Sequence, residues 1–440
     1  AALMRPSRRL LGLGLIALAV SLLVIASGET AAEAALFLWA GLGGILLIDM
    51  TTSASSRNWT IDISAPNEIF TGESGHLQFV IDFNGRRPPA EIRAMLAYPK
   101  GISGPEEIPF AIAEDGSQAG IRVRLTARQR GSWTIDRGWL FWTSRFGLIE
   151  YVPRSPLDIR IDVVPNIRPI QSGQIDVAVR SALFGSKQNV LQGEGSEFHQ
   201  LRDFTNGMDT RSIDWKHSAR SRSLIAKEMR AERNHQIILA LDNGFLMSEE
   251  IAGLPKIDHA VNAALVTAWA GVLGGDMVGL YAYDSTPRVY LPPQAGRGGF
   301  ARLRSQTAEL DYRSVESNPT LAMAHLHARL QRRSLIVIFT DFVDTTTAEL
   351  LVENVGLLSR HHVVVFVGLR DPAVEAIASE APDTLTDVAR SVTAAQMLME
   401  RRIVFEKLTR MGVICVDVPP EAVSARLVST YLSIKSREMI

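Results

Sequence analysis

Cysteine is almost absent from this chain of 440 residues, in which Cys415 is the only one. No disulfide can form within the chain, so a disulfide-stabilised secreted scaffold is excluded and a reducing compartment is indicated. A charge excess of one sign is also lacking, because 46 Lys and Arg residues against 47 Asp and Glu residues leave a formal net charge of -1. Dedicated nucleic-acid-binding proteins usually have a strong basic excess, so we expect no nucleic-acid partner.

The common catalytic and nucleotide-binding motifs are missing too. The chain has no G-x-x-x-x-G-K-[ST], and no G-x-G-x-x-G follows the apolar run at 236–241. These absences disfavour a P-loop and a dinucleotide site. G-x-S-x-G and H-E-x-x-H do not occur either, which removes the usual signatures of serine hydrolases and zinc proteases. We therefore expect a protein that is not an enzyme.

Two long apolar runs stand near the N-terminal end, at residues 10–27 and 34–48. A membrane-crossing helix needs about 20 largely apolar residues. The first run meets this length, whereas the second needs the residues up to 52 and requires Asp49 to extend to the far interface. We predict a membrane hairpin over residues 1–56, with spans at about 10–27 and 34–52.

Charges around the two runs predict their orientation. Arg9 precedes the first run and Arg57 follows the second, while only Glu29 and Glu33 lie between them. The positive-inside rule then places both termini in the cytoplasm. A cleaved signal peptide is the alternative, but it leaves the second run unexplained.

Alternating hydrophobic and polar residues over 57–165 predict a β-rich, sandwich-like domain, as in 76–83, 121–125 and 139–142. We expect this domain to be a spacer or a binding module. From 234 to 440 the pattern changes to continuous apolar runs alternating with helical segments, which is typical of an α/β domain with a doubly wound parallel sheet. The predicted strands are 236–241, 277–283, 335–339, 363–367 and 413–418, and the predicted helices are about 257–273, 348–360 and 421–436.

Asp242 and Asp341 are the best candidates for a site in this α/β domain. Each follows a predicted strand, and ligands of such sheets bind at the carboxyl ends of strands. Two carboxylates at neighbouring strand ends can share Mg2+, which prefers oxygen ligands. Alternatively, each carboxylate caps a helix or accepts hydrogen bonds from loop N–H groups.

Residues 180–233 resemble the signature of the domain of unknown function 58 family. The resemblance lies in Gly195-Ser-Glu-Phe-His-Gln-Leu-Arg-Asp-Phe, in Gly207-Met-Asp-x-Arg-x-Ile-Asp-Trp-Lys-x-x-Ala-Arg220, and in the later Glu232 and Asp242. Seven residues of this signature either bind a partner or have a purely structural role. In the structural role, the segment packs onto the following sheet with its charges paired. The seven residues are Glu197, Arg202, Asp209, Arg211, Asp214, Trp215 and Arg220.

The resemblance implies a von Willebrand factor A-like domain after the signature and, in many members, an N-terminal membrane hairpin. Domains of this kind can bind Mg2+ through an Asp-x-Ser-x-Ser loop, a Thr and a second Asp. The matching positions are Asp242, Thr320 and Asp341, but Gly244 and Leu246 stand where the two serines would be. We therefore expect no cofactor beyond weak Mg2+ occupancy of a degenerate site.

The family resemblance also implies a partner, because its members are typically encoded beside a MoxR-type AAA+ ATPase and are thought to act with it in assembling or maturing other proteins. We therefore predict a membrane-anchored, non-enzymatic and chaperone-like adaptor at the inner membrane of a bacterial cell, whose client the sequence does not identify. Two alternatives stay open. One is a Mg2+-dependent hydrolase that uses Asp242 and Asp341, and the other is a passive cell-envelope scaffold.

Overall fold

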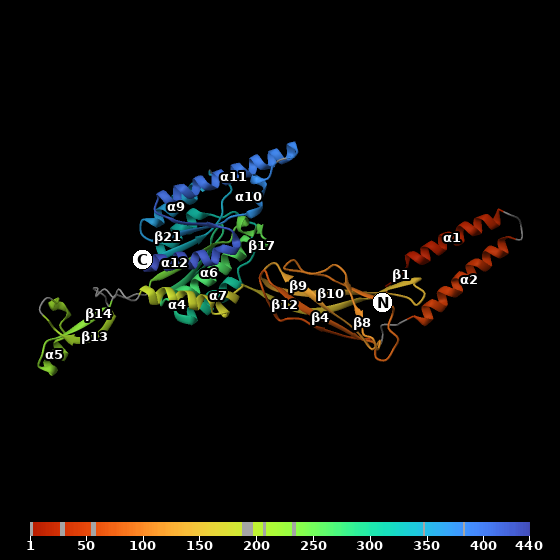
Figure 1. The fold of residues 1–440 in the computed structure, drawn as a ribbon, viewed down its shortest axis with the longest axis horizontal. Helices are drawn as coiled ribbons and strands as arrows, with labels where there is room; N and C mark the ends of the chain where they lie inside the picture. Colours follow the sequence, from red (N-terminus) through yellow and green to blue (C-terminus); the bar gives the residue numbers. More distant parts are fainter. Residues whose placement is uncertain are drawn as a thin grey trace. The chain divides into compact units, whose positions relative to one another are not determined.

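The computed structural model describes residues 3–26, 31–53, 59–186, 197–205, 208–230, 235–345, 348–381 and 383–440. The chain divides into two compact units, Ala1–Val164 and Pro165–Ile440 (Figure 1). The first unit contains two N-terminal helices and the β-rich region, and the second contains the family signature and a mixed α/β region. Arg57, which the predicted orientation uses, lies outside the described residues.

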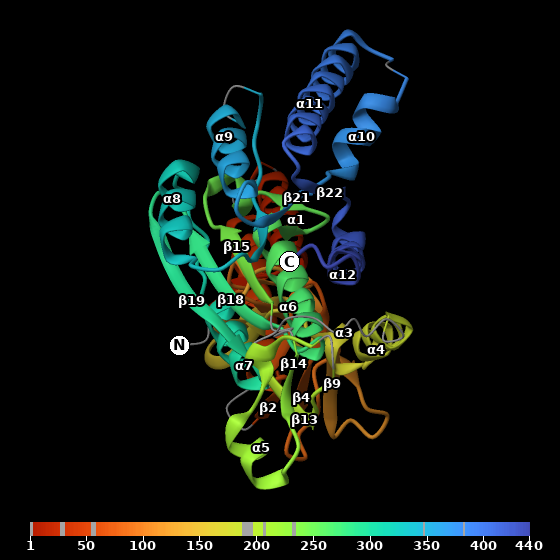
Figure 2. The ribbon, with the colours of Figure 1, turned by 90° about the vertical axis from the view of Figure 1, so that its left-hand side faces the viewer.

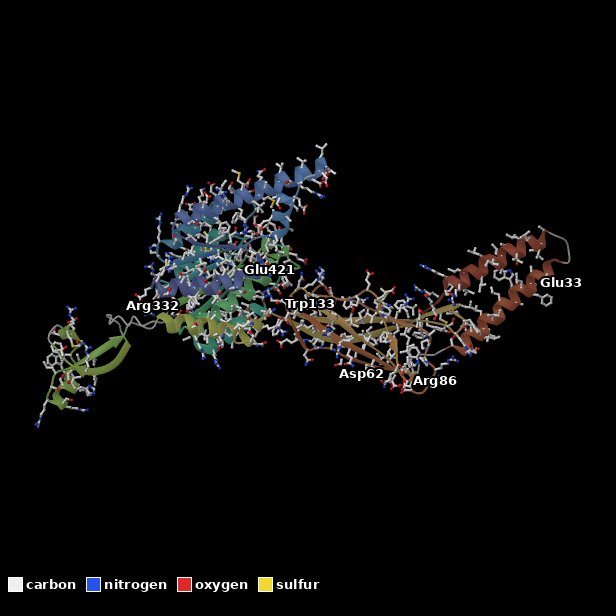
Figure 3. The ribbon with its side chains drawn as sticks, in the orientation of Figure 1. Glu33, Asp62, Arg86, Trp133, Arg332 and Glu421 are labelled. Carbon is white, nitrogen blue, oxygen red and sulfur yellow. The ribbon has the colours of Figure 1, made fainter. Side chains whose placement is uncertain are left out.

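The two N-terminal helices are α1 (Arg8–Ile25) and α2 (Ala31–Thr52). Both are long and apolar enough to cross a membrane. Their large apolar side chains are uncovered, with Leu23 73% and Phe37 74% exposed. Glu33 is the only charged side chain between Arg9 and Asp49 in the described residues, and it lies at the end of the hairpin away from the β strands (Figure 3). Helices of this composition bury their surface in lipid or in a partner.

Both ends of this helical pair contact the same turn of the β-rich region. Strand β1 (Leu3–Pro6) precedes α1 and pairs antiparallel with β11 (Ile149–Val152). Near the end of α2, Asp49 is fully buried and accepts hydrogen bonds from the backbone N–H groups of Phe146, at 2.8 Å, and Leu148, at 3.3 Å. These N–H groups satisfy the carboxylate locally, and the position of Asp49 at the far interface of a membrane stays a prediction.

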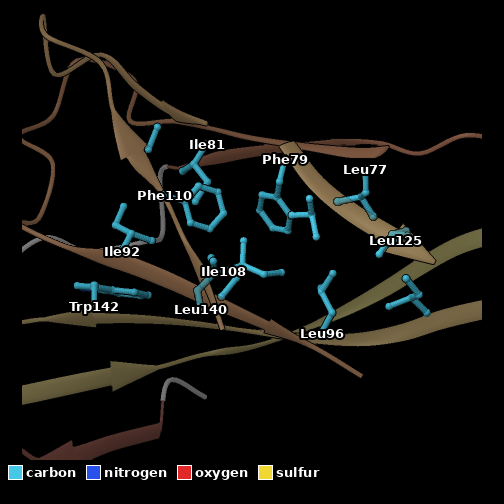
Figure 4. Packing of buried hydrophobic residues seen from close by; sticks show 14 of the residues in the cluster. Leu77, Phe79, Ile81, Ile92, Leu96, Ile108, Phe110, Leu125, Leu140 and Trp142 are labelled. Atoms are coloured by element: carbon cyan, nitrogen blue, oxygen red, sulfur yellow. The ribbon is translucent and has the colours of Figure 1, made fainter. Parts of the chain in front are cut away.

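The β-rich region consists of two sheets around one apolar core, as predicted from the alternating pattern. A seven-stranded sheet has the order β1-β11-β10-β12-β3, with β5 beside β10 and β7 beside β5. A five-stranded sheet has the order β2-β4-β9-β6, with β8 beside β9. Leu77 and Phe79 of one sheet and Leu140 and Trp142 of the other belong to the shared core (Figure 4). The strands are β2 (Thr60–Ser64), β3 (Glu68–Phe70), β4 (Ser74–Asp82), β5 (Ile92–Leu96), β6 (Ile102–Ser103), β7 (Ile108–Pro109), β8 (Ala111–Ile112), β9 (Gln118–Ala127), β10 (Gly131–Thr143) and β12 (Arg154–Val164).

A six-stranded sheet with the order β19-β18-β15-β20-β21-β22 forms the centre of the second unit. Five strands are parallel, and β19 at the edge is antiparallel to β18. The parallel strands coincide with the five predicted apolar runs, whereas β19 was not predicted. The strands are β15 (Gln236–Asp242), β18 (Met277–Tyr283), β19 (Pro287–Ala295), β20 (Leu335–Phe339), β21 (Val363–Leu369) and β22 (Ile414–Val418).

Helices cover both faces of this sheet (Figure 2). One layer contains α6 (Lys256–Leu273), α7 (Gly296–Ala308) and α12 (Pro420–Ser436), and the other contains α8 (Pro319–Arg329), α9 (Ala348–Ser359) and α11 (Leu385–Arg410). Helices α6, α9 and α12 were predicted within one residue of their observed bounds. The remaining elements are α3 (Arg168–Gln171), α4 (Gln174–Ser186), α10 (Pro372–Ser379), β16 (Glu250–Ile251), β17 (Leu254–Pro255) and the 3-10 helix η3 (Phe245–Ser248).

The family signature folds into a two-stranded antiparallel ribbon with a short helix between its strands. Strand β13 (Glu197–Asp203) pairs with β14 (Ile225–Arg230), and the 3-10 helix η2 (Thr210–Ser212) and α5 (Trp215–Ser221) connect them. Asp214 begins α5 by accepting hydrogen bonds from the N–H groups of Lys216 and His217, an N-cap that satisfies otherwise unpaired donors.

Candidate functional site

Asp242 and Asp341 lie at the point where the strand order of the sheet reverses. Counted along the chain, the sheet has the order 3-2-1-4-5-6, in which β15 is the first strand and β20 the fourth. Ligands of open α/β sheets bind beside the carboxyl ends of the two strands that meet at this switch point. Asp242 ends β15, and Thr340 and Asp341 follow β20. The topology therefore brings the predicted site residues together.

Asp242 is buried, with 4% of its surface exposed. Its Oδ2 accepts a hydrogen bond from the Thr340 hydroxyl at 2.6 Å, and its Oδ1 accepts from the Gly244 N–H at 2.9 Å and from the Ser317 hydroxyl. Burial raises the pKa of this carboxyl above its usual value, and the charge of Asp341 adds to the rise, while the three hydrogen bonds oppose it. Asp242 is therefore a buried acceptor whose oxygens are all engaged.

Gly244 makes room for Ser317 beside Asp242. A Cβ atom at position 244 would lie 2.0 Å from the Ser317 hydroxyl oxygen and 3.1 Å from the carbonyl oxygen of Val315. Position 244 has no hydroxyl, and Ser317, in the segment before α8, supplies one to Asp242 instead. Any side chain at 244 would displace Ser317 from Asp242, because interiors are close-packed.

Asp341 is held by two positive side chains of the chain itself. Its Oδ2 accepts from Lys256 Nζ at 2.6 Å, and its Oδ1 accepts from Arg401 Nη1 at 2.9 Å. The backbone N–H of Phe342 also donates to Oδ1, at 3.0 Å. The side chains of Asp341, Lys256 and Arg401 are 9%, 10% and 15% exposed, so these ion pairs lie largely out of solvent. We call these three residues the strand-end cluster.

Lys256 is the first residue of α6 and bridges two acids. Besides Asp341, its Nζ donates to Oε2 of Glu249 at 2.5 Å. Burial works against the charged ammonium, but Asp341 and Glu249 outweigh it and raise the pKa of Lys256 above its ordinary value. Lys256 therefore stays charged throughout the physiological range.

Arg401 connects the strand-end cluster to the edge strand of the sheet. Its Nη2 donates to Oδ1 of Asp417 in β22 at 3.0 Å. Its guanidinium carbon lies 5.6 Å from the ring centroid of Phe342 and 5.2 Å from that of Phe405, a favourable cation–π geometry. A Cβ at Gly368 would lie 2.4 Å from Nη2, so the glycine in β21 lets the guanidinium reach both acids.

The two strand-end carboxylates do not fit a shared divalent cation. Mg2+ requires oxygen ligands in near-octahedral geometry and usually keeps several waters. The Asp341 oxygens already hold Lys256 and Arg401, and Gly244 and Leu246 offer no side-chain oxygen. The void beside Lys256 and Asp341 has no room for a water molecule. Across the described parts of the chain, no group of three or more His, Cys, Asp or Glu side chains is placed to hold a metal ion.

Thr320 lies apart from the contacts of Asp242. Its hydroxyl accepts a hydrogen bond from the Asn354 side chain at 3.0 Å on an exposed surface. Ser317 and Thr340 are the hydroxyl residues that reach Asp242. A role of Thr320 as a metal ligand stays a prediction.

The signature residues lie on and around the β13–β14 ribbon. Trp215 is 68% exposed, and Asp209 accepts from the N–H of Arg211 at the start of η2. Asp214 is buried, and its Oδ2 lies 3.3 Å from Lys227 Nζ. The pKa of Asp214 is lowered, mainly because its carboxylate accepts a hydrogen bond from the backbone N–H of His217. The hydrogen bond with the His217 side chain lowers it further. Arg202 is half-buried and Arg220 exposed, the side chain of Glu197 is not described, and Gly195, Gly207 and Glu232 lie outside the described residues.

Three residues of this region were missed at the sequence level. Lys256 and Arg401 are 85 and 60 positions from Asp341 along the chain, and no spacing rule connects such distant residues. Asp284, by contrast, directly follows β18, at the same end of the sheet where Asp242 ends β15. It is fully buried, and its Oδ2 accepts from Arg288 at 2.8 Å, so the same strand-end rule would have found it.

Comparison with known families identifies the central part of the chain. Residues 200–409 match the model of a family described as "Protein of unknown function DUF58". The DUF58 match includes β15, β20 and all three residues of the strand-end cluster, together with most of the signature, and it confirms the resemblance seen in the sequence.

Curated relatives of the DUF58 region are uncharacterized proteins of Mycobacterium bovis and of Mycobacterium tuberculosis, each 24% identical over 192 residues. The alignment covers 43% of this chain and 60% of each relative, so the chain spans less than two thirds of their length. Among solved structures, the conserved hypothetical protein BatB from Bacteroides thetaiotaomicron is 14% identical, with a TM-score of 0.31 over 46% of this chain and 99% of BatB. An uncharacterized membrane spanning protein from Vibrio fischeri is 12% identical, with a TM-score of 0.17 over 47% of this chain and all of that chain.

Proposed function

We propose that this protein is a membrane-anchored adaptor that binds other proteins and carries out no chemical step itself. The observation that supports this function is the strand-end cluster. Asp341, which a metal-dependent hydrolase would need as an open ligand, is neutralised by Lys256 and Arg401. A buried carboxylate paired in this way is suited to holding the surrounding loops in one conformation rather than to activating water.

The anchor in this proposal is the α1–α2 hairpin. Support comes from the exposed apolar side chains of both helices and from the contacts at their ends. The residue before α1, Ser7, donates to the carbonyl oxygen of Gly147 at 2.6 Å, and Asp49 near the end of α2 accepts from Phe146 and Leu148. A hairpin returns both ends to one face of a bilayer, and on the positive-inside rule this is the cytoplasmic face of the inner membrane.

The binding module in this proposal is a von Willebrand factor A-like domain. Its support is the doubly wound sheet with the order β19-β18-β15-β20-β21-β22 and with helices on both faces. The loops at the switch point, around Asp242, Thr320 and Asp341, would contact an acidic side chain or a backbone group of the partner. A MoxR-type AAA+ ATPase is the partner that we propose, in the assembly or maturation of client proteins.

Recovery of an ATPase with the tethered protein tests this function. The full-length protein is purified from native membranes in mild detergent, and the co-purifying proteins are identified by mass spectrometry. We expect a MoxR-type ATPase with the wild type and a reduced amount with Asp341→Asn, which keeps the shape of the side chain but removes its charge. Asp311→Asn is the matched control, because Asp311 is 77% exposed. Recovery of no ATPase with the wild type would contradict the proposed partner and favour a passive scaffold.

A further inference from the structure

A groove of about 770 Å3 lies beside β22, between α11 and α12. Its walls include Arg402 and Phe405 of α11, the β22 residues from Cys415 to Val418, and Arg426 of α12. This groove is distinct from the strand-end cluster, although Arg401 contributes to both. Its volume lies within the usual range of ligand sites, about 300–1,000 Å3.

The floor of the groove is the edge of the central sheet. Strand β22 pairs with β21 on one side and ends the strand order on the other, within the part of the chain that the structure describes. The Val418 carbonyl accepts from the backbone N–H of Arg370 on the β21 side. Backbone groups of successive residues point in opposite directions, so those of Cys415 and Asp417 face outward. An edge of this kind can accept a further strand.

An arginine side chain now caps this edge. Nη2 of Arg370 donates to the outward backbone carbonyl of Asp417 at 2.6 Å. The same guanidinium lies 3.2 Å from the carboxylate of Glu375 and is 38% exposed. A half-exposed side chain can move aside at small cost, because surface ion pairs are weak. Once Arg370 moves aside, the backbone carbonyl of Asp417 can accept a hydrogen bond from an incoming N–H group.

The charges of the groove favour an acidic occupant. Its lining has five arginines and three carboxylates. Each carboxylate is already paired, Glu375 with Arg370, Glu406 with Arg402 and Arg410, and Asp417 with Arg370 and Arg401. Arg426 is exposed and has no ion pair among the described residues. A negatively charged segment would gain from this surplus of positive charge.

We propose that this groove binds an extended acidic segment of a partner protein, which adds to β22 as a further strand of the sheet. Main-chain hydrogen bonds to β22 supply affinity in this mode of recognition, and side-chain contacts supply specificity. Arg402, Arg410 and Arg426 would contact the acidic side chains. This site goes beyond the proposed ATPase partnership, and any acidic extended segment fits its chemistry.

Fluorescence anisotropy with defined peptides tests this inference on the full chain in detergent micelles. The probe is a labelled peptide of alternating Glu and Thr, and the controls are an alternating Lys and Thr peptide and the acidic peptide N-methylated at alternate residues. We expect saturable binding of the acidic peptide only. N-methylation removes the donors that a strand needs, and Arg426→Glu reverses a charge at the rim, so each should weaken binding about tenfold.

Arg437→Glu is the matched control variant, because Arg437 is exposed at the end of α12 and outside the groove. It should bind the acidic peptide as the wild type does. Equal binding of the acidic and basic peptides, no effect of N-methylation, or equal loss in Arg426→Glu and Arg437→Glu would each overturn the inference. Tighter binding of a single-stranded thymidine oligonucleotide than of the acidic peptide would do so too. The assay contains no ATPase, so its failure leaves the proposed function standing.

Discussion

Nζ of Lys256 lies 2.6 Å from Oδ2 of Asp341, where the strand order of the central sheet reverses. The ammonium of Lys256 and the guanidinium of Arg401 supply the positive charge that a bound cation would otherwise bring to Asp341. Both come from helices, Lys256 from the start of α6 and Arg401 from α11. The cluster therefore ties the two helical layers to the carboxyl edge of the sheet.

Removal of the Asp341 carboxylate should destabilise the protein strongly. Asp341→Ala leaves the ammonium of Lys256 and the guanidinium of Arg401 buried without this partner, and breaking a buried ion pair from one side costs about 3–5 kcal/mol. The free energy of unfolding of the full chain, measured in detergent by urea denaturation, provides the check. Asp311→Ala removes an exposed carboxylate that lies 3.8 Å from Arg313, and it should cost less than about 1 kcal/mol.

The double variant Lys256→Met/Asp341→Leu separates pairing from packing. Replacing both charges by apolar side chains leaves no unpaired ammonium, so this variant should be less destabilised than the two single losses added together. Coupling energies of contacting residues are about 0.5–3 kcal/mol. Strict additivity would show that Lys256 and Asp341 do not stabilise one another.

Asp242 should contribute more to the stability of the folded protein at acidic pH than at neutral pH. A carboxylate that forms ion pairs in the folded state shows the opposite dependence. Burial is the main cause that raises the pKa of Asp242 in the folded state. Its stabilising contribution is therefore complete below the unfolded pKa of 3.8 and is lost as the pH rises through the folded pKa. As the pH rises from acidic to neutral, the free energy of unfolding should fall less in Asp242→Asn than in the wild type. Unfolding measured at a series of pH values decides this, and parallel curves for the two proteins would rule out a raised pKa.

A methyl group at position 244 should disrupt the contact between Ser317 and Asp242. The new Cβ would lie 2.0 Å from the Ser317 hydroxyl, so Gly244→Ala should cost about 1–3 kcal/mol through overpacking. Ser317→Gly in the same chain removes the clashing hydroxyl and should recover part of this loss. Gly298→Ala is the control, since a Cβ there meets no atom within 4 Å. Equal melting temperatures for Gly244→Ala and the wild type would contradict the tight packing around Ser317.

Trp215 distinguishes the two roles proposed for the family signature. Because Trp215 is 68% exposed, Trp215→Ala should change the free energy of unfolding by less than about 0.5 kcal/mol. Exposed tryptophans are frequent binding hot spots, so the same variant should recover less ATPase from membranes. A large loss of stability with unchanged recovery would instead support packing of the segment onto the rest of the protein.

The central sheet was predictable because its parallel strands are apolar along their whole length. Residues 335–339 are all buried, and such runs leave a clear signal in the sequence. Strand β19 was missed because it is only half-buried and contains Pro292 and Pro293, which are typical of edge strands. Helix α11 gave no clear signal, since only Ala394, Val404, Phe405 and Leu408 are buried.

The site was predictable only where its residues are marked by a local pattern in the sequence. Strand ends mark Asp242 and Asp341 because local hydrophobic patterns reveal where strands stop. The partners of Asp341 are set by tertiary packing, and a lysine at a helix start or an arginine within a helix is usually exposed. The sequence therefore predicts two carboxylates at one edge of the sheet but not the positive charges that close the site between them.

Calorimetric titration of the purified full chain with Mg2+ and Mn2+ tests the closed strand-end cluster most directly. If Lys256 and Arg401 satisfy Asp341 as described, the wild type should show no saturable one-to-one uptake of either ion, and Asp242→Ala should give the same trace. Stoichiometric uptake by the wild type that disappears in both Asp242→Ala and Asp341→Asn would contradict the account and favour a metal-dependent activity at this site.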